Sequence, residues 1–221
     1  YMAYTGSATL DESLDNNVFV ARSATINGKD WEKWNGSSWG GDPAPAVDAE
    51  LSATETFFGA GEPSLVVKGD QIYLYYTYSD NEQKIYNVRL MTAAASDPNW
   101  PASMTDQGEV IDRTAFKGLN IDGCSVRYIE DQDCFQAVHG VNIADVNSYS
   151  VVWVSKDGVS GWEQKGVLSN NIRVRAKYAR FICNEQSHIT STTPRLMIYQ
   201  NGGQYSKTAW PTRMVPYSFV E

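Results

Sequence analysis

The sequence predicts an all-β fold, and two features of its 221 residues indicate this. First, apolar and polar residues alternate over short stretches that Gly, Asn, Asp and Ser separate, and almost no stretch has a helical period. Second, a unit of an aromatic strand, an alternating strand, a polar turn and a Trp occurs three times, ending at Trp31, Trp100 and Trp162. Units of roughly 60 to 70 residues, built from about four short strands each, are typical of propeller blades. We therefore predict a β-propeller.

The repeat divides the chain into four units that we expect to form one β-propeller domain over residues 1–221, at about 1–55, 56–117, 118–170 and 171–221. The first unit begins at what would be the second strand of a blade and lacks the innermost one. We expect sequence upstream of Tyr1 to be missing, or the ring of blades to close in an unusual way. A β-sandwich of the lectin or immunoglobulin type is the alternative fold, because it also uses short alternating strands. The repeated order of strand, strand, turn and Trp favours the propeller.

Each unit is justified by its own alternating stretches. The first has an aromatic strand at 1–5 and a second strand at 18–23. The next two units each open with a hairpin whose polar turn lies at 68–71 or at 130–133. The strands predicted for the three later units are 63–67, 72–77, 88–92, 124–129, 134–139, 150–155, 178–183 and 195–200, with one more inside 210–221.

Composition argues against several classes of function. The net charge is −8, from 18 basic and 26 acidic residues, and an acidic surface repels phosphate backbones, so nucleic acid is not an expected partner. No apolar run reaches about 18 residues, so no membrane span is expected. The three Cys show no zinc spacing, and we expect buried free thiols. No P-loop, dinucleotide fingerprint or Ser/His/Asp order is visible. The 13 Tyr and seven Trp suit both strands and platforms for sugars.

The second unit carries a resemblance to a known group of enzymes. Gly59-Ala-Gly-Glu-Pro-Ser-Leu-Val-Val67, followed by Gly69-Asp-Gln-Ile-Tyr-Leu-Tyr-Tyr-Thr77, resembles a blade of the five-bladed propeller glycoside hydrolases, glycoside hydrolase family 43 and its relatives acting on arabinans, xylans and fructans. Val20-Ala-Arg-Ser23 with Trp31, and Val154-Ser-Lys-Asp-Gly158 with Trp162, are similar to the second half of such a blade. The resemblance covers most of residues 1–170 and implies a five-bladed β-propeller.

The resemblance also implies a mechanism with three acidic residues on the innermost strands of successive blades. One carboxylate activates water, one carboxylic acid protonates the leaving oxygen, and the third tunes that acid. Glu62 and Asp122 start two of the inferred innermost strands, so Glu62 is the candidate general acid and Asp122 the candidate base or acid modulator. No residue takes the role of the first family Asp, because the first unit lacks the strand that would carry it. Structural alternatives are a backbone-bonded carboxylate at Glu62 and a side-chain turn at Asp122.

Three further residues are candidate substrate-binding residues. Arg180 lies in a basic segment and is expected to reach the axial funnel and pair with Glu62 or Asp122. His139 matches enzymes of this group that place a His near the axis, some beside a bound cation; the alternative is a hydrogen-bonded core His. Trp39 lies in a Gly/Ser-rich loop and breaks the Trp repeat, which makes it a candidate platform for sugar stacking.

Two functional hypotheses from different classes follow from these residues. The first is a secreted or periplasmic glycosidase with a carbohydrate partner, no metal at the catalytic site and no cofactor, a structural cation near the axis being compatible with the resemblance. The second is a non-catalytic carbohydrate-binding or adhesion propeller that kept the blades and lost the carboxylates. A structural β-domain of a larger secreted assembly is a third hypothesis. The sequence does not indicate the sugar, the linkage, the stereochemistry or the oligomeric state.

Overall fold

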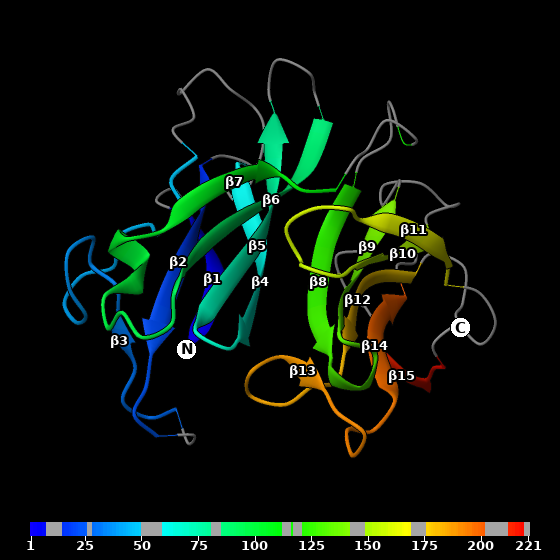
Figure 1. The fold of residues 1–221 in the computed structure, drawn as a ribbon. Helices are drawn as coiled ribbons and strands as arrows, with labels where there is room; N and C mark the ends of the chain where they lie inside the picture. The colour runs from blue at the N-terminus through cyan, green and yellow to red at the C-terminus, as the bar shows by residue number, and fades with distance from the viewer. Residues whose placement is uncertain are drawn as a thin grey trace. The chain divides into compact units, whose positions relative to one another are not determined.

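A computed structural model describes most of the chain, and nearly all of its regular structure is β (Figure 1). The described residues are 1–7, 15–25, 28–49, 59–80, 85–111, 116, 121–141, 149–168, 176–201 and 212–218. The helices whose full length they include are two short 3-10 turns, η1 (Trp100–Ala102) and η3 (Glu130–Gln132). None of these described residues forms a helix long and apolar enough to cross a membrane. The prediction of an all-β fold is confirmed.

Contacts divide the chain into two compact units, Tyr1–Gly108 and Glu109–Glu221. The first unit holds two sheets, ordered β1-β2-β3 and β4-β5-β6-β7. Their strands are β1 (Met2–Ser7), β2 (Asn16–Arg22), β3 (Glu32–Lys33), β4 (Ala60–Lys68), β5 (Gln71–Asp80), β6 (Ile85–Ala94) and β7 (Thr105–Glu109). Alternation along β2 and β5 puts Val18, Val20, Leu74 and Tyr76 into one buried cluster, which Trp100 also joins. β1 and β2 pack against β4.

The second unit holds a five-stranded sheet, ordered β11-β10-β9-β8-β13, and a three-stranded sheet, ordered β12-β14-β15. Their strands are β8 (Ile121–Ile129), β9 (Cys134–Val141), β10 (Tyr149–Ser155), β11 (Glu163–Val167), β12 (Ala176–Phe181), β13 (His188–Ile189), β14 (Leu196–Asn201) and β15 (Thr212–Pro216). Ile129, Val138, Phe181 and Met197 meet in the buried cluster that joins the two sheets. All three Cys are free; Cys124 and Cys134 are buried, as predicted, and Cys183 is half-buried.

The first sheet has fewer strands than the second. β2 leads to Trp31 just as β6 leads to Trp100 and β10 leads to Trp162, so β1 corresponds to β5 and β9. No described residue supplies this sheet with a counterpart of β4 or β8. The strand counts of the described sheets are compatible with the incomplete N-terminal blade that the sequence predicts. The strand predicted inside 210–221 is present as β15 and pairs with β14.

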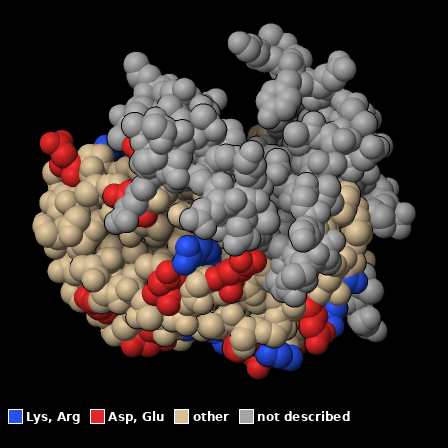
Figure 2. All heavy atoms as spheres, turned by 90° about the horizontal axis from the view of Figure 1, so that it is seen from above, with Lys and Arg blue, Asp and Glu red and all other residues tan. Residues whose placement is uncertain are grey.

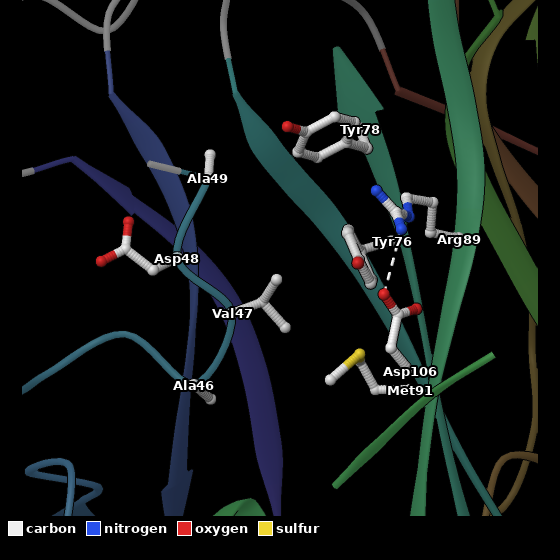
Figure 3. A pocket seen from close by; sticks show the side chains of 9 residues that line it. All are labelled: Ala46, Val47, Asp48, Ala49, Tyr76, Tyr78, Arg89, Met91 and Asp106. Atoms are coloured by element: carbon white, nitrogen blue, oxygen red, sulfur yellow. Dashed lines mark hydrogen bonds and ion pairs between the residues drawn. The ribbon is translucent and has the colours of Figure 1, made fainter. Parts of the chain in front are cut away.

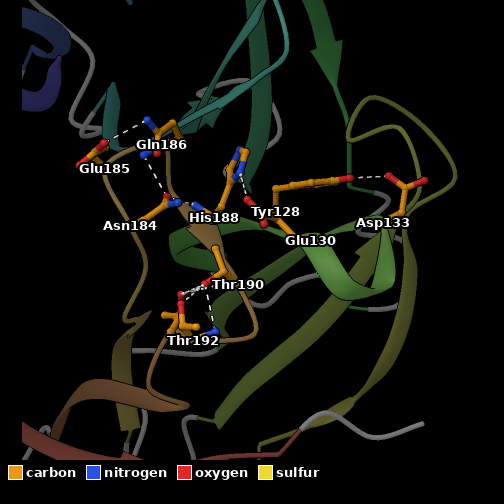
Figure 4. Close-up of polar contacts among 10 residues, drawn as sticks. Tyr128, Glu130, Asp133, Asn184, Glu185, Gln186, His188, Thr190 and Thr192 are labelled. Carbon is orange, nitrogen blue, oxygen red and sulfur yellow. Dashed lines mark hydrogen bonds and ion pairs between the residues drawn. The ribbon is translucent and has the colours of Figure 1, made fainter.

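A polar network closes the β8–β9 hairpin of the second unit (Figure 4). His188 on β13 places its Nδ1 2.9 Å from Oε1 of Glu130 in η3, and the ring of His188 meets Tyr128 edge-on. The Tyr128 hydroxyl donates to Asp133. β13 runs parallel to β8 at this end, where His188 aligns with Tyr128 and Ile189 with Ile129. The network lies at the opposite end of β8 from Asp122, so it stabilises the turn at a distance from the predicted site.

The surface seen in Figure 2 mixes acidic and basic side chains. No extended basic patch is visible among its coloured atoms. This distribution agrees with the net charge of −8.

Candidate active site

The start of β4 bends out of its regular register and carries Glu62. Gly61 aligns with Thr77 and Ser64 with Tyr75, so Glu62 and Pro63 together oppose a single residue, Tyr76. This is a β-bulge, which bends a strand and re-aims the side chains at the bend. Pro63 has no N–H to lose from the ladder and is tolerated at such a position.

Glu62 itself adopts an unusual backbone conformation. Its φ is 51°, in the left-handed region that residues with a Cβ rarely occupy. The Glu62 N–H donates a 2.7 Å hydrogen bond to Oγ1 of Thr5 on β1, and a Cβ at Gly61 would come within 3.2 Å of the Thr5 side chain. The strand that packs beside β4 thus holds the bulge, and Glu62 is half-buried there.

The same irregularity recurs in β8 at the second candidate carboxylate. Asp122 aligns with Gly140 and Ser125 with Val138, so the two residues between them, Gly123 and Cys124, oppose His139. Gly123 has a φ of 71°, like Glu62 at the corresponding place in β4. Asp122 therefore lies one register position earlier than Glu62. The structure describes the backbone of Asp122, and its side chain lies outside the described residues.

A third β-bulge occurs in β12, and Arg180, which follows it, contacts the β8 bulge. The register shifts between Lys177 and Arg180, so two residues of β12 oppose Tyr199 of β14. Directly after this bulge, Arg180 donates from Nη1 to the carbonyl oxygens of Gly123, at 3.1 Å, and Cys124, at 2.7 Å. Its described partners are thus the bulge carbonyls next to Asp122. The predicted pairing of Arg180 with a carboxylate stays a prediction.

A second guanidinium lies near Arg180. Burial lowers the pKa of Arg127 on β8, and the positive charge of Arg180 lowers it further, while the Cys183 thiol opposes the shift. The two arginines make the surroundings of the β8 bulge positively charged, which favours an ionised carboxylate nearby. The sequence gives no signal for Arg127, because an Arg within a strand usually points to solvent.

His139 is fully buried in the second unit. Trp153 donates from Nε1 to Nε2 of His139 at 3.3 Å, and Phe116 meets the imidazole edge-on. Nε2 accepts, so the proton of the neutral ring is on Nδ1. In the register, His139 of β9 opposes Gly123 and Cys124 of the β8 bulge. Substrate binding by His139 stays a prediction.

Trp39 is packed against neighbours of the first unit. Its Nε1 donates to the Pro98 carbonyl at 2.7 Å, Arg22 lies 4.8 Å from the ring centre, and Trp34 meets the ring edge-on. Arg22 lies over the indole, and the ring centre of Tyr1 lies 5.8 Å from that of Trp39. The geometry supports a role in packing the 34–40 loop, and sugar stacking by Trp39 stays a prediction.

Glu62 belongs to the first compact unit, and Asp122, Arg180 and His139 belong to the second. Each unit is described by itself, so the shared concavity of Glu62 and Asp122 stays a prediction. Among the described residues, no group of three or more His, Cys, Asp or Glu side chains is placed to hold one metal ion.

Comparisons with known proteins support the fold and give no close relative. No protein-family model matches the sequence, and no curated protein matches it. Among solved structures, a thermostable family-43 glycoside hydrolase has 13% identity and a TM-score of 0.62 over 100% of this chain and 68% of its own. The catalytic domain of the Coprinopsis cinerea family-62 α-L-arabinofuranosidase has 11% identity and a TM-score of 0.58 over 90% of this chain and 64% of its own.

A third similar structure, the Bombyx mori family-32 β-fructofuranosidase, has 10% identity and a TM-score of 0.59 over 96% of this chain and 44% of its own. Identities this low bear on the fold alone, and they confirm the predicted resemblance at that level: the chain has a family 43-like propeller fold. The chain spans 64% of the length of the family-62 catalytic domain and 44% of the family-32 enzyme.

Proposed function

We propose that the protein is a glycoside hydrolase acting on oligo- or polysaccharides, with Glu62 as general acid. The observation that carries this proposal is the left-handed backbone of Glu62 inside the β4 bulge. Such a conformation costs a non-glycine residue about 1–3 kcal/mol, and outliers of this kind cluster at active sites. The fold shared with glycoside hydrolases supports carbohydrate as the substrate class. A secreted or periplasmic location is part of this proposal.

The chemistry requires two carboxyl groups in unequal environments on opposite sides of the glycosidic bond. Glu62, protonated, would donate its proton to the leaving oxygen. Asp122, ionised, would activate water or tune the acidity of Glu62. Arg180 supports this division, because its guanidinium is bonded to the carbonyls of the two residues that follow Asp122. A positive charge within about 4–6 Å of a carboxylate lowers its pKa, which is the effect that we propose for Arg180 on Asp122.

Hydrolysis by single variants tests the proposal. We expect Glu62→Gln and Asp122→Asn each to lower kcat/KM on arabino- and xylo-oligosaccharides by about 100-fold or more, the usual contribution of a general acid or base. Glu163, an exposed residue paired with Lys165, provides the matched control: Glu163→Gln should retain full activity. All three variants should melt close to the wild-type temperature, since both amides are nearly isosteric with the carboxyl groups they replace.

The leaving group separates an acid from a structural residue. p-Nitrophenolate leaves without help from an acid, so Glu62→Gln should lose far less activity on p-nitrophenyl glycosides than on oligosaccharides. Equal losses on both substrates would show that Glu62 is not the acid. A wild-type protein that binds polysaccharide and hydrolyses none of these substrates would instead support the non-catalytic carbohydrate-binding propeller.

A further inference from the structure

The first compact unit contains a pocket of about 290 Å³ that none of the predicted site residues lines (Figure 3). One wall is the segment 46–49, which follows β2 through hydrogen bonds between Val18 and residues Ala46 and Val47. The other wall is the face of β5, β6 and β7 that carries Tyr76, Tyr78, Arg89, Met91 and Asp106. The pocket therefore lies between the two sheets of the first unit. Its sheet wall is formed by β5, β6 and β7, the strands that follow β4 in the second sheet.

The polar groups of the sheet wall converge on Arg89. Nη2 of Arg89 lies 3.0 Å from Oδ2 of Asp106, and the guanidinium carbon lies 5.1 Å from the centre of the Tyr78 ring. Nε of Arg89 is buried and has no hydrogen-bond partner among the described residues. A buried donor of this kind costs free energy until an acceptor reaches it.

Tyr76 supplies a hydroxyl beside this pair. Burial raises the pKa of Tyr76 to about 12; Arg89 lowers it and Asp106 raises it. The phenol therefore keeps its proton at neutral pH and can donate as well as accept. An aromatic surface, a hydroxyl, a guanidinium and a carboxylate, with Val47 and Met91 as apolar contacts, match the alternating apolar and hydroxyl surfaces of a sugar ring.

The charge of the lining selects among sugars. Arg89 and Asp106 neutralise each other at 3.0 Å, and the carboxylate of Asp48 on the other wall points away from them (Figure 3). A uronic acid or a phosphorylated sugar would bring a second anion beside Asp106, whose charge Arg89 already balances, whereas the hydroxyls of a neutral sugar can donate to the Asp106 carboxylate and accept from Arg89. The volume lies at the lower end of the roughly 300–1,000 Å³ typical of ligand pockets, which suits a single sugar residue.

We propose that this pocket, which Glu62 does not line, binds one neutral sugar residue of a carbohydrate chain. Such a site holds a polysaccharide through a residue that is not being cleaved. The proposal does not depend on catalysis, because none of its residues is assigned a step in hydrolysis.

The test follows methyl groups of the whole chain by NMR. The sequence has five Met, and Met91 lines the pocket, while Met197 is buried in the second unit and Met214 is exposed on β15. With methyl-¹³C methionine, assigned through Met91→Leu, we expect titration with D-xylose, L-arabinose or D-galactose to shift Met91 and leave Met197 and Met214 in place. D-Galacturonate should shift Met91 much less. The same Met91 response is expected in Glu62→Gln, which separates this site from turnover.

Two variants and a matched control complete the experiment. Tyr76→Phe removes one buried hydroxyl and should raise the sugar dissociation constant about five- to tenfold, the value of one hydrogen bond. Asp106→Asn, at a more exposed position, should weaken binding too and guards against a folding defect in the first variant. Tyr73→Phe alters the opposite face of β5 and should bind like the wild type. The proposal is overturned if no neutral sugar shifts Met91, if galacturonate binds as well, or if both pocket variants bind like Tyr73→Phe.

Discussion

Glu62 occupies a backbone conformation that its own side chain disfavours. A left-handed φ raises the conformational free energy of a residue with a Cβ by roughly 1–2 kcal/mol and that of glycine hardly at all. In β8 the corresponding position is Gly123, which has the same sign of φ. The fold therefore accepts glycine here, and Glu62 is present at the expense of stability.

The strained backbone of Glu62 predicts that replacing this residue by glycine has opposite effects on stability and on activity. Glu62→Gly should be as stable as the wild type or more stable by up to about 1 kcal/mol, because the strain is relieved. It should also lose hydrolytic activity. Urea unfolding measures the first effect. A variant less stable than the wild type by more than about 1 kcal/mol would mean that the carboxylate has a structural role.

Sequence reasoning reached some of these residues and missed others. Glu62 and Asp122 could be selected because each starts a predicted strand. The φ of Glu62 could not be predicted, since it depends on Thr5 from another strand. The Gly/Ser-rich loop around Trp39 makes this residue a candidate platform for sugar stacking. The contacts of its ring with Arg22 and Trp34 could not be predicted, because they depend on how that loop folds back.

At the scale of elements, one hydrogen bond connects β1 to the β4 bulge. Thr5→Val keeps the shape of the side chain and removes the hydroxyl that accepts from the Glu62 N–H. We expect a loss of about 1 kcal/mol in the free energy of unfolding and a fall in kcat, because Glu62 is no longer held. Thr92→Val removes a hydroxyl from an exposed pair with Gln107 and serves as the control. Unchanged kcat in Thr5→Val would show that β1 does not position Glu62.

The turn after β10 is organised by Asp157. Burial alone would raise its pKa, but hydrogen bonds from the Ser160 N–H and hydroxyl, the Val159 N–H and the Ser155 hydroxyl outweigh burial and lower the pKa to about 2. A carboxyl group whose pKa is lower in the folded state than in the unfolded state stabilises the fold at pH values above the unfolded pKa, which is near 3.8 here. This stabilisation is lost as the pH falls toward 2.

Asp157→Asn should therefore lower the melting temperature at pH 7. The difference in melting temperature between variant and wild type should become smaller as the pH drops from about 4 to 2. Melting curves across this interval measure the effect. The group is largely exposed, so solvent screening keeps it small. A constant difference between variant and wild type at every pH would contradict the role of the ionised carboxylate.

Alternation and turn chemistry predicted the elements well. The 68–71 turn forms with Gly69 at a φ of 59°, and the 130–133 turn forms as η3 with Asp133 left-handed. The three bulges could not be predicted, because a register shift depends on the partner strand. Trp100 and Trp162, which end the second and third repeated units, are buried, whereas Trp31 is 39% exposed and Trp34 is the buried Trp near it.

For the whole molecule, the repeat predicted the fold class, and the comparisons confirm a propeller fold of the family 43 kind. The repeat predicts function less well than it predicts the fold. Core packing specifies the blades, whereas a glycosidase needs carboxylates from different sheets at one place. Glu62 and Asp122 lie about 60 residues apart in two such sheets, as a repeat of this size implies. Their separation in space is the quantity on which the account depends.

The most direct test is therefore a crystal structure of the protein with the distance between the Glu62 and Asp122 carboxyl groups measured. The account predicts a separation of about 5–9.5 Å across a shared concavity, with about 5–5.5 Å indicating retention and about 6.5–9.5 Å inversion of configuration. Carboxyl groups that point into different cavities, or lie farther apart than about 12 Å, would contradict it, because a single glycosidic bond could not then reach both.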